Sequence, residues 1–201
     1  KTPERFARYC ERVTKHLGDL ISTACTINEA NISALLSKLM PVEFQKQTWW
    51  QVASQAFGVS TDRLGVFMFS DPVRSRETIL SAHRRAFDAL HSGSSNFPVG
   101  MTLALPDIQH VEGGESAAAA IRHEIGDLYL ETLGKDDFVG VQTYARMVYG
   151  PNGQVPHAEG VELNQMGEEY YPEALGGTIR YAAQTAGIPM YVTENGLAST
   201  D

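Results

Sequence analysis

The stretch Tyr191-Val192-Thr193-Glu194-Asn195-Gly196 places a carboxylate where an apolar strand meets a glycine turn. Near the other end of the chain, Thr26-Ile27-Asn28-Glu29-Ala30 repeats this arrangement. Taken separately, Glu29 fits the N-cap region of a following helix, and Glu194-Asn195-Gly196 fits a polar turn. Taken together, the two runs put one glutamate at the C-terminal end of each of two predicted strands. Cleavage of a glycosidic bond requires such a pair of carboxyl groups.

Predicted helices and strands alternate along the rest of the chain. Helical spacing of apolar residues predicts helices over residues 2–17, with Thr2 as N-cap, and over 77–91, 115–133 and 172–186. Apolar runs predict strands over residues 20–27, 99–105, 138–144 and 190–193. Residues 31–75 are less regular, with a helix predicted near 43–57, and the composition of residues 146–167 is typical of a long loop.

Strands separated by helical crossovers predict a parallel sheet in an α/β fold. Right-handed crossovers bring the carboxyl ends of all four strands to one edge. In a (β/α) barrel that edge carries the chemistry. The residues predicted at these exits are Glu29, Asp107, Gln142, Tyr144 and Glu194.

Several motifs together resemble glycoside hydrolase family 1, the retaining β-glucosidases and their relatives. They occur in family order, as Asn28-Glu29 after the helix that ends in Leu17-Gly18-Asp19, residues 137–144, residues 166–175 and residues 191–196. The resemblance implies a (β/α)₈ TIM barrel, of which this chain covers roughly strands four to seven. The chain departs from the family pattern at Ala24, Ala30, Gln142, Thr143 and Glu168.

The same resemblance assigns roles to five residues. It implies that Glu194 is the nucleophile and Glu29 the acid/base, with the pKa of Glu29 raised by the charge of Glu194 and by partial burial. It also implies that Asn28 and Gln142 contact the substrate and that the Tyr144 hydroxyl holds the nucleophile carboxylate. Without the resemblance, Tyr144 is more often interpreted as a packed aromatic residue.

Composition narrows the choice of partners. The 201 residues carry a net charge of −8, which argues against nucleic acid or an anionic membrane as a partner. The only two cysteines, Cys10 and Cys25, favour a reducing compartment and a cytoplasmic protein.

We expect no cofactor and no metal, because Asp127 stands where an H-E-x-x-H zinc helix starting at His123 needs its second histidine. The pair Trp49-Trp50 fits either a sugar-stacking platform or helix packing.

Length is the last constraint. A (β/α)₈ domain needs ~250 residues, so residues 1–201 are expected to form a single incomplete catalytic domain whose partner is the remainder of its own barrel. Three interpretations follow: a retaining β-glycosidase acting on β-glycosides or oligosaccharides, a catalytically impaired carbohydrate-binding or scaffold fragment of that family, and an unrelated α/β enzyme.

Overall fold

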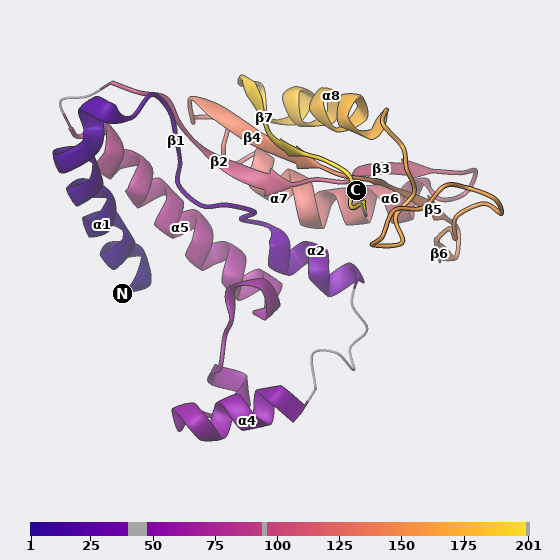
Figure 1. Ribbon diagram of the computed structural model, residues 1–201, viewed down its shortest axis with the longest axis horizontal. Coiled ribbons are helices and arrows are strands. Elements are labelled where there is room, and N and C mark those ends of the chain that lie inside the picture. Colours follow the sequence, from indigo (N-terminus) through magenta and orange to yellow (C-terminus); the bar gives the residue numbers. More distant parts are fainter. Residues whose placement is uncertain (40–47, 94–95, 200–201) are drawn as a thin grey trace.

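A curled sheet of four parallel strands organises the protein. The computed structural model describes residues 1–39, 48–93 and 96–199. The strands are β1 (Ala24–Cys25), β2 (Val99–Ala104), β4 (Phe138–Thr143) and β7 (Met190–Asn195), in the order β1-β2-β4-β7. All neighbouring pairs are parallel. The curled sheet has the form of about half of a (β/α)₈ barrel, as the family resemblance implies (Figure 1).

Helices connect these strands. They are α1 (Thr2–Leu17), α2 (Ile32–Leu39), α4 (Thr48–Phe57), α5 (Pro72–His91), α6 (Glu115–Arg122), α7 (Leu128–Leu130) and α8 (Ala174–Ala186). One π-helical turn, His123–Asp127, joins α6 to α7. None of the helices in the described part of the chain has the length and apolarity that crossing a membrane requires.

Local capping explains where the helices begin and end. The first residue of α5 is Pro72, five residues before the predicted start, because the Asp71 carboxylate caps the helix by accepting the Arg74 N–H at 2.8 Å. Lys1, and not Thr2, is the N-cap of α1. Gly187 ends α8 with a left-handed φ of 70°, which glycine adopts without strain.

The core lies under the two central strands. Every residue of β2 and β4 is buried, and Met101, Leu103, Val139 and Val141 pack with residues of α5, α7 and α8. The outer strands β1 and β7 are at most half-buried, because each pairs on one side only. Two edges of the sheet are therefore open.

Some predictions were wrong. Residues 146–167 contain β5 (Arg146–Gly150) and β6 (Gly153–Gln154), which with β3 (Asp107–His110) form a second sheet. These strands are short, and β3 pairs with β5 across about 40 residues of sequence, so no local periodicity marks them. The strand predicted at 20–27 is reduced to Ala24–Cys25, and α2 lies within the stretch expected to be irregular. Residues 43–47 of the helix predicted near 43–57 lie outside the described residues.

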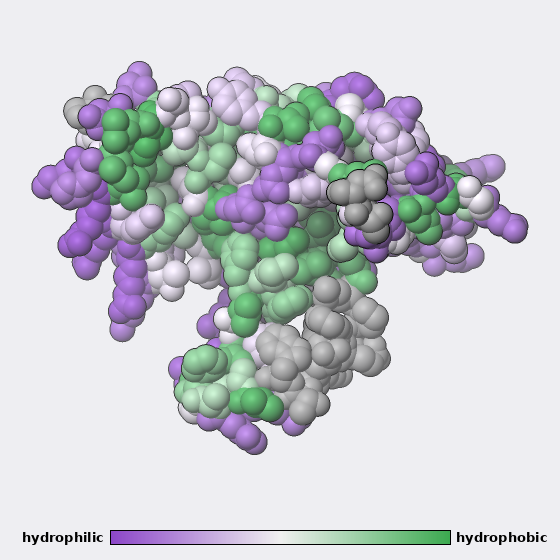
Figure 2. Space-filling view, in the orientation of Figure 1, coloured by the Kyte–Doolittle hydropathy of each residue, from purple (hydrophilic) through white to green (hydrophobic). Residues whose placement is uncertain are grey.

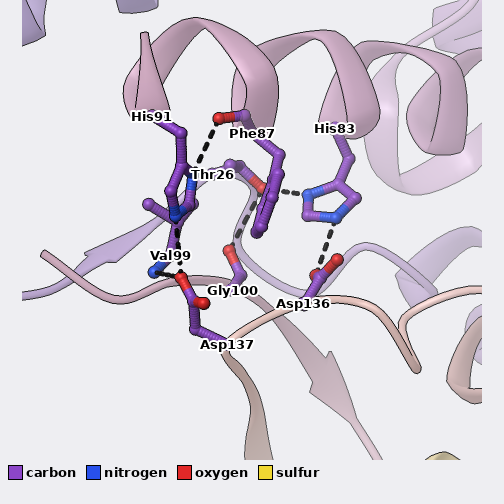
Figure 3. A network of polar contacts seen from close by, with 8 residues as sticks. All are labelled: Thr26, His83, Phe87, His91, Val99, Gly100, Asp136 and Asp137. Carbon is purple, nitrogen blue, oxygen red and sulfur yellow. Dashed lines mark hydrogen bonds and ion pairs between the residues drawn. The ribbon is translucent and has the colours of Figure 1, made fainter. Parts of the chain in front are cut away.

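A polar network fastens α5 to the sheet (Figure 3). His83 Nδ1 lies 2.7 Å from the Thr26 hydroxyl in a partly buried contact, and its Nε2 lies 2.8 Å from Asp136 Oδ2 in nearly complete burial. Next to it, Asp137 Oδ2 contacts His91 at 3.0 Å and accepts the Val99 N–H at 2.8 Å. Because Val99 and Asp137 lie at the strand beginnings, these contacts set the end of the sheet opposite the predicted glutamates.

Candidate active site

Glu194 lies near the end of β7, where the strand pairing is irregular. Val141 pairs with Val192, but Gln142 pairs with Glu194, so Thr193 is one extra residue on β7. Such a bulge changes the direction of the side chain that follows it. The two carboxylate oxygens of Glu194 accept hydrogen bonds from Gln142 Nε2 and from the Tyr144 hydroxyl, each at 2.5 Å.

Glu29 lies in a turn after β1. With a φ of 47°, it is the only non-glycine residue with positive φ in the described part of the chain. Around it, Ile27 O accepts the Thr102 N–H at 3.2 Å, and Thr102 O accepts the Ala30 N–H at 3.0 Å. These partners are three positions apart, one more than in a regular parallel ladder. The extra residue makes the turn, and backbone strain of this kind gathers at functional sites.

A continuous hydrogen-bonded ladder joins the two exits. The Glu29 N–H donates to the Thr102 hydroxyl at 2.9 Å, and that hydroxyl donates to Asn28 Oδ1 at 3.0 Å. Gln142 Nε2 donates to the same Asn28 oxygen at 2.7 Å and also to Glu194. The ladder therefore spans all four strands of the sheet, and it orients each of its amides.

The electrostatic surroundings differ between the titratable groups. Burial, and then the negative charge of Glu194, raise the pKa of Glu29. Both causes agree with the sequence-based expectation, and the second shows that the two carboxylates interact. Burial, the hydrogen bond to Glu194 and the charges of both glutamates raise the pKa of Tyr144 well above its usual value. Its hydroxyl therefore stays protonated at neutral pH and donates a hydrogen bond to Glu194.

Solved structures of β-glycosidases match this half-barrel. The crystal structure of β-glycosidase BGL167 is 48% identical, with a TM-score of 0.90 over 100% of this chain and 49% of its own. The apo structure of β-glucosidase 1317 is 33% identical, with a TM-score of 0.83 over 99% of this chain and 49% of its own. The chain resembles part of a β-glycosidase barrel of the glycoside hydrolase family 1 type.

Among curated proteins, the chain is similar to the β-galactosidase of Saccharolobus solfataricus, at 27% identity over 98% of the chain and 44% of that protein. No family model matches it. The chain spans about half the length of these relatives.

The structure brings the five predicted site residues together: Asn28, Glu29, Gln142, Tyr144 and Glu194. Asp107 is apart from them. Its carboxylate accepts from Gln109 Nε2 at 2.6 Å and packs so closely on Gly177 that a Cβ there would lie 2.6 Å away. Trp50 is buried at 7% exposure, which favours packing for this residue.

Asp107 belongs to a second polar network at the same edge. Arg146 binds the Glu169 carboxylate with two hydrogen bonds of 2.7 Å, donates to Gln109 Oε1 at 3.1 Å, and stacks 3.9 Å above the Tyr171 ring. This network fixes the loop before α8 against β5. It also anchors the chain two residues after Tyr144.

Sequence reasoning missed two residues that shape the site, Thr102 and Asn31. Thr102 is the one hydroxyl residue in the apolar run of residues 99–105, which is a signal the sequence does contain. Asn31 is fully buried, and its amide binds Ala104 N–H, Ala104 O and Ile125 O at 2.7–2.9 Å. It fastens the chain immediately after Glu29 to the end of β2.

Proposed function

We propose that the enzyme containing this half-barrel is a retaining β-glycosidase in which Glu194 is the nucleophile and Glu29 the acid/base. One observation carries the proposal. Two glutamates lie at separate strand exits and interact electrostatically; side chains donate to both oxygens of Glu194, and the pKa of Glu29 is raised. That division matches the needs of a retaining mechanism.

The first chemical step needs an ionised nucleophile and a protonated acid. A Glu194 oxygen attacks the anomeric carbon, the glycosidic C–O bond breaks, and the Glu29 proton passes to the departing oxygen. The hydrogen bonds from Gln142 and Tyr144 hold the Glu194 carboxylate in place. Formation of the glycosyl ester removes the Glu194 charge, which lowers the pKa of Glu29. Glu29 then accepts a proton from the water that releases the sugar.

The neighbouring amides take different parts. Asn28 is exposed, and within the described residues only its oxygen is engaged, so its Nδ2 is the group that would donate to a sugar hydroxyl. Gln142 is 1% exposed, and Asn28 and Glu194 take its amide hydrogens. We assign Gln142 the task of orienting these two residues, and the substrate class is a β-glycoside.

The remaining strands of the barrel would close on the two open edges. Tyr191 and Val192 on β7 are 42% and 47% exposed, which an isolated sheet edge rarely sustains. On the β1 side, a groove of about 1180 Å³ between α1, α2 and α5 is lined by Phe6, Leu36 and Ile79. Figure 2 shows apolar side chains over α2 and the adjoining part of this face. Strands paired with the two open edges would complete the barrel around the two glutamates.

A covalent label tests the proposal. A 2-deoxy-2-fluoro β-glycoside with a good leaving group should add its glycosyl mass to the peptide that carries Glu194, and Glu194→Gln should remove the label. A label on another carboxylate would contradict the assignment of the nucleophile.

The second candidate function is a non-catalytic carbohydrate-binding or scaffold protein. The departures from the family pattern favour it, because Ala30 adjoins Glu29 and Gln142 contacts Glu194. Turnover of an aryl β-glucoside that is abolished by Glu194→Gln would exclude this function. Sugar binding without any turnover would support it.

A further inference from the structure

Thr102 occupies the centre of the hydrogen-bonded ladder. Its side chain is 3% exposed, on the buried strand β2, and its hydroxyl both accepts the Glu29 N–H and donates to Asn28 Oδ1. Its backbone N–H and C=O bind Ile27 and Ala30 on either side of the turn. No other described residue contacts the Glu29 turn with so many groups.

We propose that Thr102 is a positioning residue for the acid/base: its hydroxyl holds the strained Glu29 turn so that the carboxyl group faces the leaving oxygen. The proposal rests on the proposed glycosidase function. The backbone bonds of Ile27 and Ala30 fix the chain on both sides, but the hydroxyl bonds the peptide N–H of Glu29 itself. It therefore acts on the one residue that has a left-handed φ.

Packing holds this hydroxyl in one orientation. A Cβ on Gly140 would lie 2.6 Å from Thr102 Cγ2 and 3.1 Å from Thr193 Cγ2, so the two threonine methyl groups close over the glycine. The methyl group of Thr102 is thus seated against β4 while its hydroxyl points to the β1 turn. Valine keeps this shape and loses both hydrogen bonds, whereas serine keeps the hydroxyl and loses only the methyl group.

This role has a kinetic signature that loss of stability does not have. Cleavage of an alkyl β-glycoside needs a proton from the acid, whereas a 2,4-dinitrophenyl group departs without one. A displaced Glu29 therefore slows the first substrate and spares the second. Misplacement of a catalytic group by about 1 Å costs up to ~100-fold in rate.

The experiment compares kcat/KM for an alkyl and a 2,4-dinitrophenyl β-glycoside in a preparation whose wild type hydrolyses both. Thr102→Val should lose about 10- to 100-fold on the alkyl glycoside and less than about threefold on the activated one. Thr102→Ser should restore most of the loss. Thr14→Val is the matched control, because it removes a buried hydroxyl that donates to Leu90 O between α1 and α5.

Equal losses on both substrates, or no recovery with serine, would overturn the role of Thr102. If Thr102→Val does not fold, Thr102→Cys carries the same comparison, because a thiol is a weak donor and a weak acceptor. Fluoro-sugar labelling of Glu194 separates the two claims. Labelling without a leaving-group effect sinks only the positioning role, whereas absence of labelling in the wild type sinks the glycosidase assignment beneath it.

Discussion

Glu194 and Glu29 lie at the exits of the two edge strands, yet the hydrogen-bonding surroundings of their carboxylates differ. Side chains from β4 and the residues that follow it donate to both oxygens of Glu194. Within the described residues no side chain donates to the Glu29 carboxylate; the ladder holds its peptide N–H instead. Hydrogen bonds favour an ionised carboxylate, whereas burial favours a protonated one. In the proposed mechanism, these two environments, and not the residue type, would separate the nucleophile from the acid.

The largest expected effect is on the nucleophile. Glu194→Gln should lower turnover of every β-glycoside, activated or not, by about 10⁵-fold or more, because no covalent intermediate can form. Initial rates with a 2,4-dinitrophenyl β-glycoside measure the loss. Retention of substantial activity on that substrate would show that the two glutamates have the opposite roles.

Glu29→Ala should discriminate between substrates. On an alkyl β-glycoside it removes the proton donor, at an expected cost of about 10²- to 10⁴-fold in kcat/KM. On the dinitrophenyl substrate kcat/KM should change far less, because the leaving group needs no proton. Uniform losses across leaving groups would contradict an acid role for Glu29.

Tyr144→Phe should have a smaller effect, since it removes one of the two donors to Glu194 and leaves Gln142 in place. A hydrogen bond to a charged group contributes about 1.5 kcal/mol, so we expect kcat/KM to fall about tenfold. A phenol absorbance titration checks the geometry. The tyrosine that disappears in the variant should titrate above the usual tyrosine range, because its pKa is raised, and Glu194→Gln should lower that pKa.

The parts that sequence predicted well are those with strong local signals. The buried strands β2 and β4, helix α5 from residue 77 onward, and the stop of α8 at Gly187 all follow from apolar runs and a glycine. The motifs placed Glu29 and Glu194 at strand exits, where they are found. The structure shows which residues meet there, and the roles remain the proposal above.

What sequence did not predict depends on contacts between distant segments. The pairing of β3 with β5 joins Asp107 to Arg146. Polar side chains of these two strands take part in the network around Arg146 and Glu169, so the strands do not show a regular alternation of apolar and polar residues. The left-handed turn at Glu29 is equally invisible, because glutamate has no preference for positive φ. That turn depends on Thr102, which is 73 residues away in sequence.

The smallest expected effect concerns stability, and it follows from the cost of keeping Glu29 in this environment. Since burial and the Glu194 charge raise the pKa of Glu29 in the folded state, the folded protein binds a proton more tightly than the unfolded chain does. Stability contributed by the protonated group is present below the ordinary glutamate pKa and is lost as the pH rises through the raised folded pKa. Glu29→Gln removes this penalty, so the variant should melt at a higher temperature than the wild type at about pH 7 and show no such advantage at about pH 4.

Glu112→Gln, at an exposed glutamate, serves as the control. An equal gain in melting temperature at both pH values would mean that ionising Glu29 does not destabilise the folded protein. The contrast with Glu194 would then rest on hydrogen bonding alone.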